Sequence, residues 1–221
     1  MVVNEKKTTI LCVSDATSFT PEVRLAVGQG NEEVKSGDKL KLLGFTFTRS
    51  PNVNYHLDLI IKKLRSRSWA LSRLRRAGFS EQELVKFYCG AIRPVAEYAS
   101  PAFHSLIPGY LSAALERQQN QALKNIYGIG LSARKMREKA GIKTLYSRRE
   151  DATLKFAEKA VKSERFGVWF PRRAVMSARS GRPFVEKVSR TERNRNAPIN
   201  YMIRLLNNSR ERAANEASGQ R

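Results

Sequence analysis

Cysteine and histidine are scarce in this sequence, which has two of each among its 221 residues. The cysteines, Cys12 and Cys89, form no Cys-x-x-Cys pair, and the histidines, His56 and His104, lie far apart. A zinc cage or a disulfide framework needs more of these residues at closer spacing. The sequence therefore excludes both kinds of scaffold and indicates a reducing compartment.

Long apolar runs are missing as well. Charged residues begin at Glu5, so no signal peptide is expected after Met1, and no stretch of about 18 uncharged apolar residues occurs. We therefore expect an intracellular protein of the nucleus or cytoplasm, which is not secreted and does not have a membrane as its partner.

Acidic residues are few, because 20 Asp and Glu stand against 41 Lys and Arg, for a formal net charge of +21. Residues 1–59 carry seven charges of each sign. Residues 60–171 carry 22 basic and nine acidic residues, and residues 172–221 carry 12 and four. Such an excess favours a polyphosphate partner, either RNA or DNA, over a small-molecule substrate. Because 41% of the residues are hydrophobic, the chain can also bury a core.

The densest basic run extends from residue 62 to residue 76 and contains no acid. Apolar residues between positions 57 and 74 have helical spacing, and most of the basic residues lie off that apolar face. Trp69, inside the same helix, is expected to pack in the core. Uncompensated charge favours phosphate contacts over a merely solvated face. The predicted nucleic-acid-binding residues are Lys62, Lys63, Arg65, Arg67, Arg73, Arg75 and Arg76.

Residues before position 54 have strand-like patterns. Branched and aromatic residues with partial alternation predict strands over 8–14 and 39–48, and a weaker one over 23–27. The residues Gly28, Gly30 and Asn31 are expected to form a turn. This region is predicted to be a small antiparallel β-ribbon.

From residue 54 the apolar spacing becomes helical. One helix is predicted to end at Gly78. A second is predicted to begin near Glu81 behind a Ser80–Glu83 capping box, with Pro94 either kinking or ending it. Further helices are predicted over residues 110–127, 132–140 and 144–161.

Beyond Pro171 the sequence is rich in Arg, Ser and Asn, and apart from a short helix near residues 201–206 it is expected to be flexible. The predicted fold class is α+β and predominantly α-helical. It combines a small antiparallel β-ribbon, a thumb-like helical bundle and a disordered basic C-terminal tail.

Six segments occur in an order that characterises a known family. They are Asn4-x-x-Lys7-Thr8, Leu-Leu-Gly-Phe-Thr at 42–46, Trp-Ala-Leu-Ser-Arg-Leu at 69–74, Ile-Arg-Pro-Val-Ala-Glu-Tyr-Ala-Ser-Pro at 92–101, Leu-Glu-Arg-Gln-Gln at 115–119 and Leu-Tyr-Ser-Arg-Arg at 145–149. Over about residues 1–170 the chain resembles the C-terminal part of the reverse transcriptase of non-LTR (LINE-type) retrotransposons, from the end of the palm through the thumb and a connecting region.

The resemblance implies roles for particular residues. Lys7 matches the motif D lysine, which lies near the phosphates of the incoming nucleotide. Leu43, Gly44 and Phe45 match the motif E hairpin known as the primer grip. The basic helix over residues 57–77 corresponds to a thumb helix that follows the template–primer duplex, such as an RNA–DNA hybrid.

The catalytic centre of that family is not expected in this chain. The complete polymerase needs two Mg²⁺ ions held by clustered aspartates. The four aspartates here are not adjacent to one another, and no Tyr-x-Asp-Asp turn occurs; they are Asp15, Asp38, Asp58 and Asp151. We therefore expect motifs A to C to lie upstream of Met1, and this chain alone to have no catalytic residue, no cofactor and no polymerase activity.

The resemblance divides the chain into four regions. These are a palm remnant (1–53), a thumb-like helical region (54–128), a helical connecting region (129–171) and a basic tail (172–221). The implied function is that of a truncated RNA-directed DNA polymerase fragment that retains sequence-nonspecific template–primer binding. The alternatives are a stand-alone basic RNA-binding or architectural protein and the non-functional product of a decayed retroelement. A hairpin over 39–48 that leads directly into a helix is required by a palm-to-thumb junction and favours the first.

Overall fold

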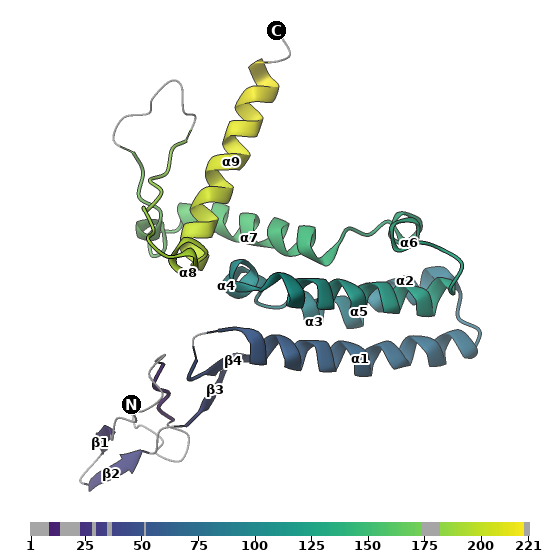
Figure 1. Ribbon diagram of the computed structural model, residues 1–221, viewed down its shortest axis with the longest axis horizontal. Coiled ribbons are helices and arrows are strands. Elements are labelled where there is room, and N and C mark those ends of the chain that lie inside the picture. Colours follow the sequence, from purple (N-terminus) through teal and green to yellow (C-terminus); the bar gives the residue numbers. More distant parts are fainter. Residues whose placement is uncertain are drawn as a thin grey trace. The chain divides into compact units, whose positions relative to one another are not determined.

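A computed structural model describes residues 9–13, 23–27, 30–34, 37–50, 52–173 and 182–218. The chain divides into two compact units, residues 1–60 and residues 61–221. Figure 1 shows the helices and strands with the labels used below. Each unit is described by itself.

The first unit contains two antiparallel hairpins. Strand β1 (Val23–Val27) pairs with β2 (Gly30–Val34), and β3 (Lys39–Leu42) pairs with β4 (Phe45–Thr48). Leu43 and Gly44 connect β3 to β4 with φ angles of 47° and 83°. Two consecutive positive φ values define a tight two-residue turn whose twist matches that of the strands. The predicted strands at 23–27 and within 39–48 are confirmed.

Two local predictions for this unit are wrong. Gly30 and Asn31 belong to β2, because the register pairs them with Val27 and Ala26 of β1 instead of placing them in a turn; Gly28, the third residue of that predicted turn, lies outside the described residues. Within residues 9–13 of the strand predicted over 8–14, Ile10 forms only a single bridge, and its carbonyl accepts a hydrogen bond from the Gly37 N–H at 2.9 Å. Strand-like residues form a strand only where a partner strand is free to pair along their length, and local sequence does not contain that information.

The second unit is helical, and α1 (Asn54–Arg76) leads into it. The buried side chains of α1 in this unit recur at helical spacing. They are Ile61, Leu64, Ser68 and Leu71. Gly78, at a φ of 88°, follows the helix, as predicted, because glycine adopts this left-handed conformation without steric cost.

The next segment begins with α2 (Glu81–Phe87), whose predicted capping box is present. The chain then widens into a π-helix, η2 (Tyr88–Ile92), and returns to α-helix in α3 (Arg93–Glu97). Pro94 lies in the first turn of α3, where its missing N–H removes no helical bond. The helical segment therefore continues past the proline. It is irregular there, because a π-turn precedes Pro94. Two short helices follow, α4 (Ser100–Phe103) and the 3₁₀-helix η3 (His104–Leu106).

Three longer helices complete the predicted part of the bundle. They are α5 (Gly109–Tyr127), α6 (Ala133–Ala140) and α7 (Leu145–Lys162), and a 3₁₀-turn, η4 (Gly167–Trp169), comes after them. Helix α5 contacts α2, α6 and α7. The buried Tyr88 hydroxyl donates to Gln119 Oε1 at 2.9 Å, and Gln119 Nε2 donates to the Lys143 carbonyl at 3.1 Å. This bridge joins η2, α5 and the entry to α7 within the core.

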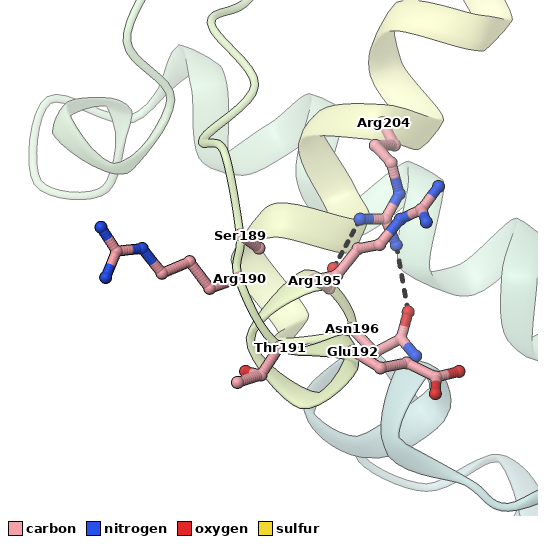
Figure 2. Close-up of a pocket in the computed structure, with 7 residues that line it drawn as sticks. All are labelled: Ser189, Arg190, Thr191, Glu192, Arg195, Asn196 and Arg204. Atoms are coloured by element: carbon pink, nitrogen blue, oxygen red, sulfur yellow. Dashed lines mark hydrogen bonds between the residues drawn. The ribbon is translucent and has the colours of Figure 1, made fainter.

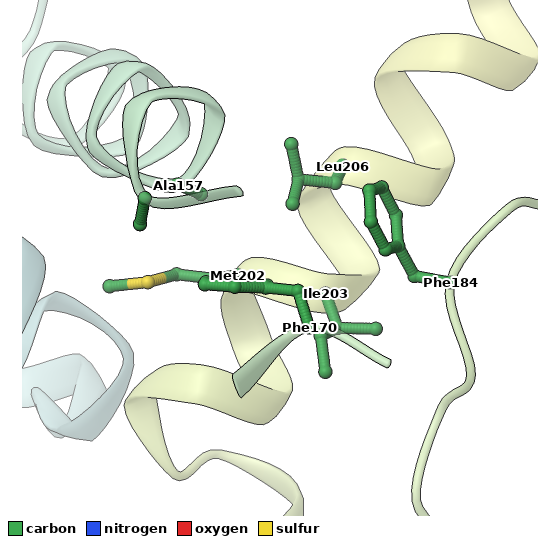
Figure 3. Close-up of a cluster of buried hydrophobic side chains, with 7 residues drawn as sticks. Ala157, Phe170, Phe184, Met202, Ile203 and Leu206 are labelled. Carbon is green, nitrogen blue, oxygen red and sulfur yellow. The ribbon is translucent and has the colours of Figure 1, made fainter. Parts of the chain in front are cut away.

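The C-terminal region differs most from its prediction. Residues 182–218 contain α8 (Glu192–Arg195) and a long helix, α9 (Pro198–Ser218), which contacts α7. Met202, Ile203 and Leu206 of α9 are buried against Ala157 of α7 and against Phe170 and Phe184 (Figure 3). The expectation of a disordered tail over 172–221 is therefore wrong for these residues.

The fold class is confirmed as α+β and predominantly α-helical, with small antiparallel β-ribbons before the helices. Among the described residues, no helix is both long enough and apolar enough to cross a bilayer.

Candidate nucleic-acid interface

Helix α1 carries a straight row of basic side chains on its exposed face. Residues of an α-helix follow each other by about 100°, so positions separated by three or four residues share a face. Five exposed residues with such spacing fall within an arc of about 80°. We call this row the α1 stripe, and it consists of Lys62, Arg65, Trp69, Arg73 and Arg76. The buried apolar residues of α1 lie on the other side of the helix.

Trp69 does not pack in the core as expected. Its side chain is 59% exposed, and the guanidinium carbon of Arg73 lies 4.7 Å from the centre of its ring. An arginine at this distance is attracted to the ring face, and the indole remains accessible. The stripe therefore presents an accessible aromatic surface among positive charges, which can contact the phosphates and a base of a nucleic acid.

Two of the predicted binding residues fix α1 to the rest of the second unit. Arg67 Nη1 donates to the Ala91 carbonyl at 2.6 Å, and Arg75 Nη1 donates to the Asn125 carbonyl at 3.3 Å. Asn125 in turn donates through its side-chain amide to the Ser68 carbonyl at 3.2 Å. Arg67 and Arg75 therefore have a positioning role. Lys63 is exposed, and it lies about 100° around the helix from the first residue of the stripe.

Among the described residues, the cations of the stripe lack acidic partners, whereas several other basic residues of the chain have one. Elsewhere, Lys139 lies 2.6 Å from Glu81 and Lys143 lies 2.7 Å from Asp151. Within the described ranges, the cations of the stripe form no ion pair. The charge of Arg73 and Arg76 also interacts favourably with the C-terminal end of the α1 dipole. That effect extends over only the last turn, so it does not account for Lys62 and Arg65.

The hairpin that resembles the primer grip lies in the first unit. Leu43, at the turn, is 83% exposed, and Gly44 follows it. The ring of Phe45 lies 4.2 Å from the ring of His56, and His56 Nδ1 accepts the Thr46 N–H at 3.3 Å. These contacts fix the hairpin to the start of α1. Lys7 lies outside the described residues.

The second histidine belongs to a buried polar cluster. His104 is 5% exposed, and Tyr201 of α9 lies with its hydroxyl 3.4 Å from His104 Nε2 and 3.0 Å from Glu150 Oε1. Burial and, secondarily, the charge of Arg149 lower the pKa of His104 to about 4. The His104 ring is therefore neutral at neutral pH. This arrangement joins α9 to α7 and η3, and it serves packing.

No metal centre is apparent in the described part of the chain, where no three His, Cys, Asp or Glu side chains are grouped to hold an ion. Asp38 lies just before β3, Asp58 lies in α1 and Asp151 lies in α7, whereas Asp15 is outside the described residues. The site that the structure assembles is the α1 stripe, with four of the seven predicted basic residues.

Comparison with known proteins found no matching family model, no matching curated protein and no matching solved structure.

Proposed function

We propose that this chain binds nucleic-acid backbone through the α1 stripe, with little sequence preference. The observation that carries the proposal is the alignment on one face of α1 of an exposed tryptophan and four cations that form no ion pair with the residues that the structure describes. Phosphate contacts determine affinity and position but do not read bases, so the binding is nonspecific in sequence. We place this activity inside the cell, in the nucleus or cytoplasm.

Two features support the further proposal that the chain is the thumb-containing fragment of a non-LTR reverse transcriptase. The six segments of sequence follow the family order, and the β3–β4 hairpin leads within a few residues into α1, as a palm-to-thumb junction requires. In this proposal the ligand is a template–primer duplex, and the residues described here hold it without performing chemistry on it. Magnesium would belong to the complete polymerase.

The test compares two variants of equal net charge. The stripe variant replaces the four cations of the stripe with glutamine, and the control variant replaces four other exposed lysines, Lys135, Lys155, Lys159 and Lys162. Each phosphate contact contributes about 0.9 to log K for every tenfold dilution of salt below 1 M. At about 0.1 M salt, loss of four contacts is therefore expected to weaken binding to an RNA–DNA hybrid by about 4 × 10³-fold, against less than about tenfold for the control.

Equal losses in the two variants would refute the stripe as the binding surface, since they would reflect net charge alone. A panel of ligands separates the proposed fragment from a stand-alone RNA-binding protein. A thumb binds an RNA–DNA hybrid at least as tightly as single-stranded RNA of the same length, whereas a clear preference for single-stranded or looped RNA would contradict the reverse transcriptase assignment.

A further inference from the structure

A cavity outside α1 has a lining rich in arginine. The segment from residue 189 to residue 204 borders an open cavity of about 500 Å³ around α8 and the first turns of α9 (Figure 2). A space of this size accommodates a small ligand. The residues that line it are Ser189, Arg190, Thr191, Glu192, Arg195, Asn196 and Arg204.

Local hydrogen bonds hold the walls of the cavity in place. Thr191 Oγ1 accepts the Asn194 N–H at 3.2 Å, and Asn200 Nδ2 of α9 donates to the Asn194 carbonyl at 2.8 Å. The guanidinium of Arg204 reaches back from α9 to the loop, where it donates to the Arg195 carbonyl and, at 3.3 Å, to Asn196 Oδ1. The cavity is therefore a built feature that links α8 to α9.

The charges of the cavity are not neutralised from within. Arg204 is half-buried, and both of its hydrogen bonds go to neutral acceptors. None of the charged residues of the lining forms an ion pair in the part of the chain that the structure describes, Glu192 included. Three arginines and one glutamate leave the lining with an excess of two positive charges.

The side chains of Arg195 and Arg204 extend toward the same side of the loop in Figure 2, whereas Arg190 extends away from them. A guanidinium carries five N–H donors, so Arg204 keeps donors beyond the two it uses. The Thr191 hydroxyl accepts the Asn194 N–H and can still donate its own proton. These groups can bind an oxyanion with several acceptor oxygens.

We propose that this cavity binds a phosphate monoester or inorganic phosphate, with Arg204 and Arg195 as the principal donors. Such a phosphate carries about −1.5 to −2 charges near pH 7 and three acceptor oxygens, which the guanidiniums of Arg195 and Arg204 can share. A phosphodiester carries only one negative charge, so it is attracted less strongly by this pair of arginines. The phosphate can come from the terminus of a nucleotide or oligonucleotide or from free phosphate. The site shares no residue with the α1 stripe.

The test is a titration of the full chain with inorganic phosphate, in which binding is measured by isothermal titration calorimetry. Saturable binding is expected in the unaltered chain. Arg204→Gln is expected to weaken it by about tenfold or more and Arg195→Gln by several-fold, because each removes a charge-assisted hydrogen bond. Arg212→Gln, which removes an exposed arginine farther along α9, should change the affinity by less than about twofold.

Three results would overturn the proposal: no saturable phosphate binding by the unaltered chain, an unchanged affinity in Arg195→Gln, or an equal loss in Arg212→Gln. Arg195 contributes only backbone groups to the hydrogen bonds described for the loop: its N–H donates to the Thr191 carbonyl, and its carbonyl accepts from Arg204. Arg195→Gln therefore keeps the test valid if Arg204→Gln fails to fold. A nucleoside 5′-monophosphate that binds more tightly than inorganic phosphate identifies a nucleotide terminus as the source, and equal affinities identify free phosphate.

The stripe variant separates this inference from the proposed function. It is expected to bind inorganic phosphate as the unaltered chain does, while losing affinity for nucleic-acid duplex. Loss of phosphate binding in the stripe variant would contradict an independent site.

Discussion

Acidification is expected to destabilise the second unit through His104. The folded chain keeps this ring neutral, because burial and the nearby charge of Arg149 lower its pKa from 6.5 to about 4. Tyr201, whose pKa is raised by burial, stays protonated and can donate to Glu150, so His104 Nε2–H donates to the tyrosine oxygen. Within the described part of the chain, His104 Nδ1 is buried without a hydrogen-bond partner, and the centres of the His104 and Tyr146 rings lie 5.0 Å apart. A second proton on the ring would therefore have no acceptor.

The sign and size of the change in the free energy of unfolding follow from the difference in proton binding at His104 between the folded and the unfolded chain. The unfolded chain binds a proton at His104 below about pH 6.5, whereas the folded chain does so only below about pH 4. The neutral ring therefore contributes stability that is complete above about pH 6.5 and is lost as the pH falls toward 4. Each pH unit between the unfolded and the folded pKa corresponds to about 1.4 kcal/mol of stability. The assay stops at about pH 4.5, above the folded pKa, so it covers only about two of these units. The expected loss of stability between about pH 7.5 and pH 4.5 is therefore about 2.5 kcal/mol at most.

The assay is urea unfolding, measured by circular dichroism at both pH values, for the unaltered chain and for His104→Gln. Carboxylates titrate in both proteins, so the difference between them isolates the histidine. The unaltered chain is expected to lose about 2.5 kcal/mol more than the variant on acidification. Equal losses in the two proteins would refute the buried neutral His104.

Three other substitutions test packing, exposure and capping by equilibrium unfolding. Ile203→Ala, at a fully buried position of α9, is expected to lower the free energy of unfolding by about 2–5 kcal/mol, and a change below about 0.5 kcal/mol would mean that α9 does not pack on α7. Trp69→Ala should cost less than about 0.5 kcal/mol because the indole is exposed, and a loss of about 3–5 kcal/mol would place it in a core instead. Ser80→Ala removes the N-cap of α2 and should cost about 1 kcal/mol, whereas Ser80→Gly should cost only a few tenths; equal effects would argue against the side-chain cap.

Local signals in the sequence were sufficient for much of the helical fold. The capping box at Ser80, the glycine stop at Gly78 and the spacing of apolar residues in α1 depend on neighbours within one or two turns. The helix α9 depends on more distant partners. Its apolar residues Met202, Ile203 and Leu206 have helical spacing, but they are few among polar neighbours, and they become a core only against Ala157 and Phe170. A pattern read along the chain does not reveal such partners.

The candidate site was predictable to the same degree. The excess of positive charge in α1 follows from counting residues, and the stripe follows from helical spacing. Which of the seven basic residues face solvent and which fix the helix to its neighbours does not follow from the sequence, because Arg67 and Arg75 donate to carbonyls 24 and 50 positions away. The spacing of Trp69 from Arg65 and Arg73 was a signal that could have placed this aromatic residue on the exposed face.

The most direct test of the central proposal is the salt dependence of binding. The affinity of the unaltered chain and of the stripe variant for an RNA–DNA hybrid would be measured by fluorescence anisotropy between about 50 and 300 mM salt. If the four cations of the stripe contact phosphates, the slope of log K against log salt concentration is steeper in the unaltered chain by about 3.6. Equal slopes in the two proteins would show that the stripe contacts no phosphate, and would contradict the proposal.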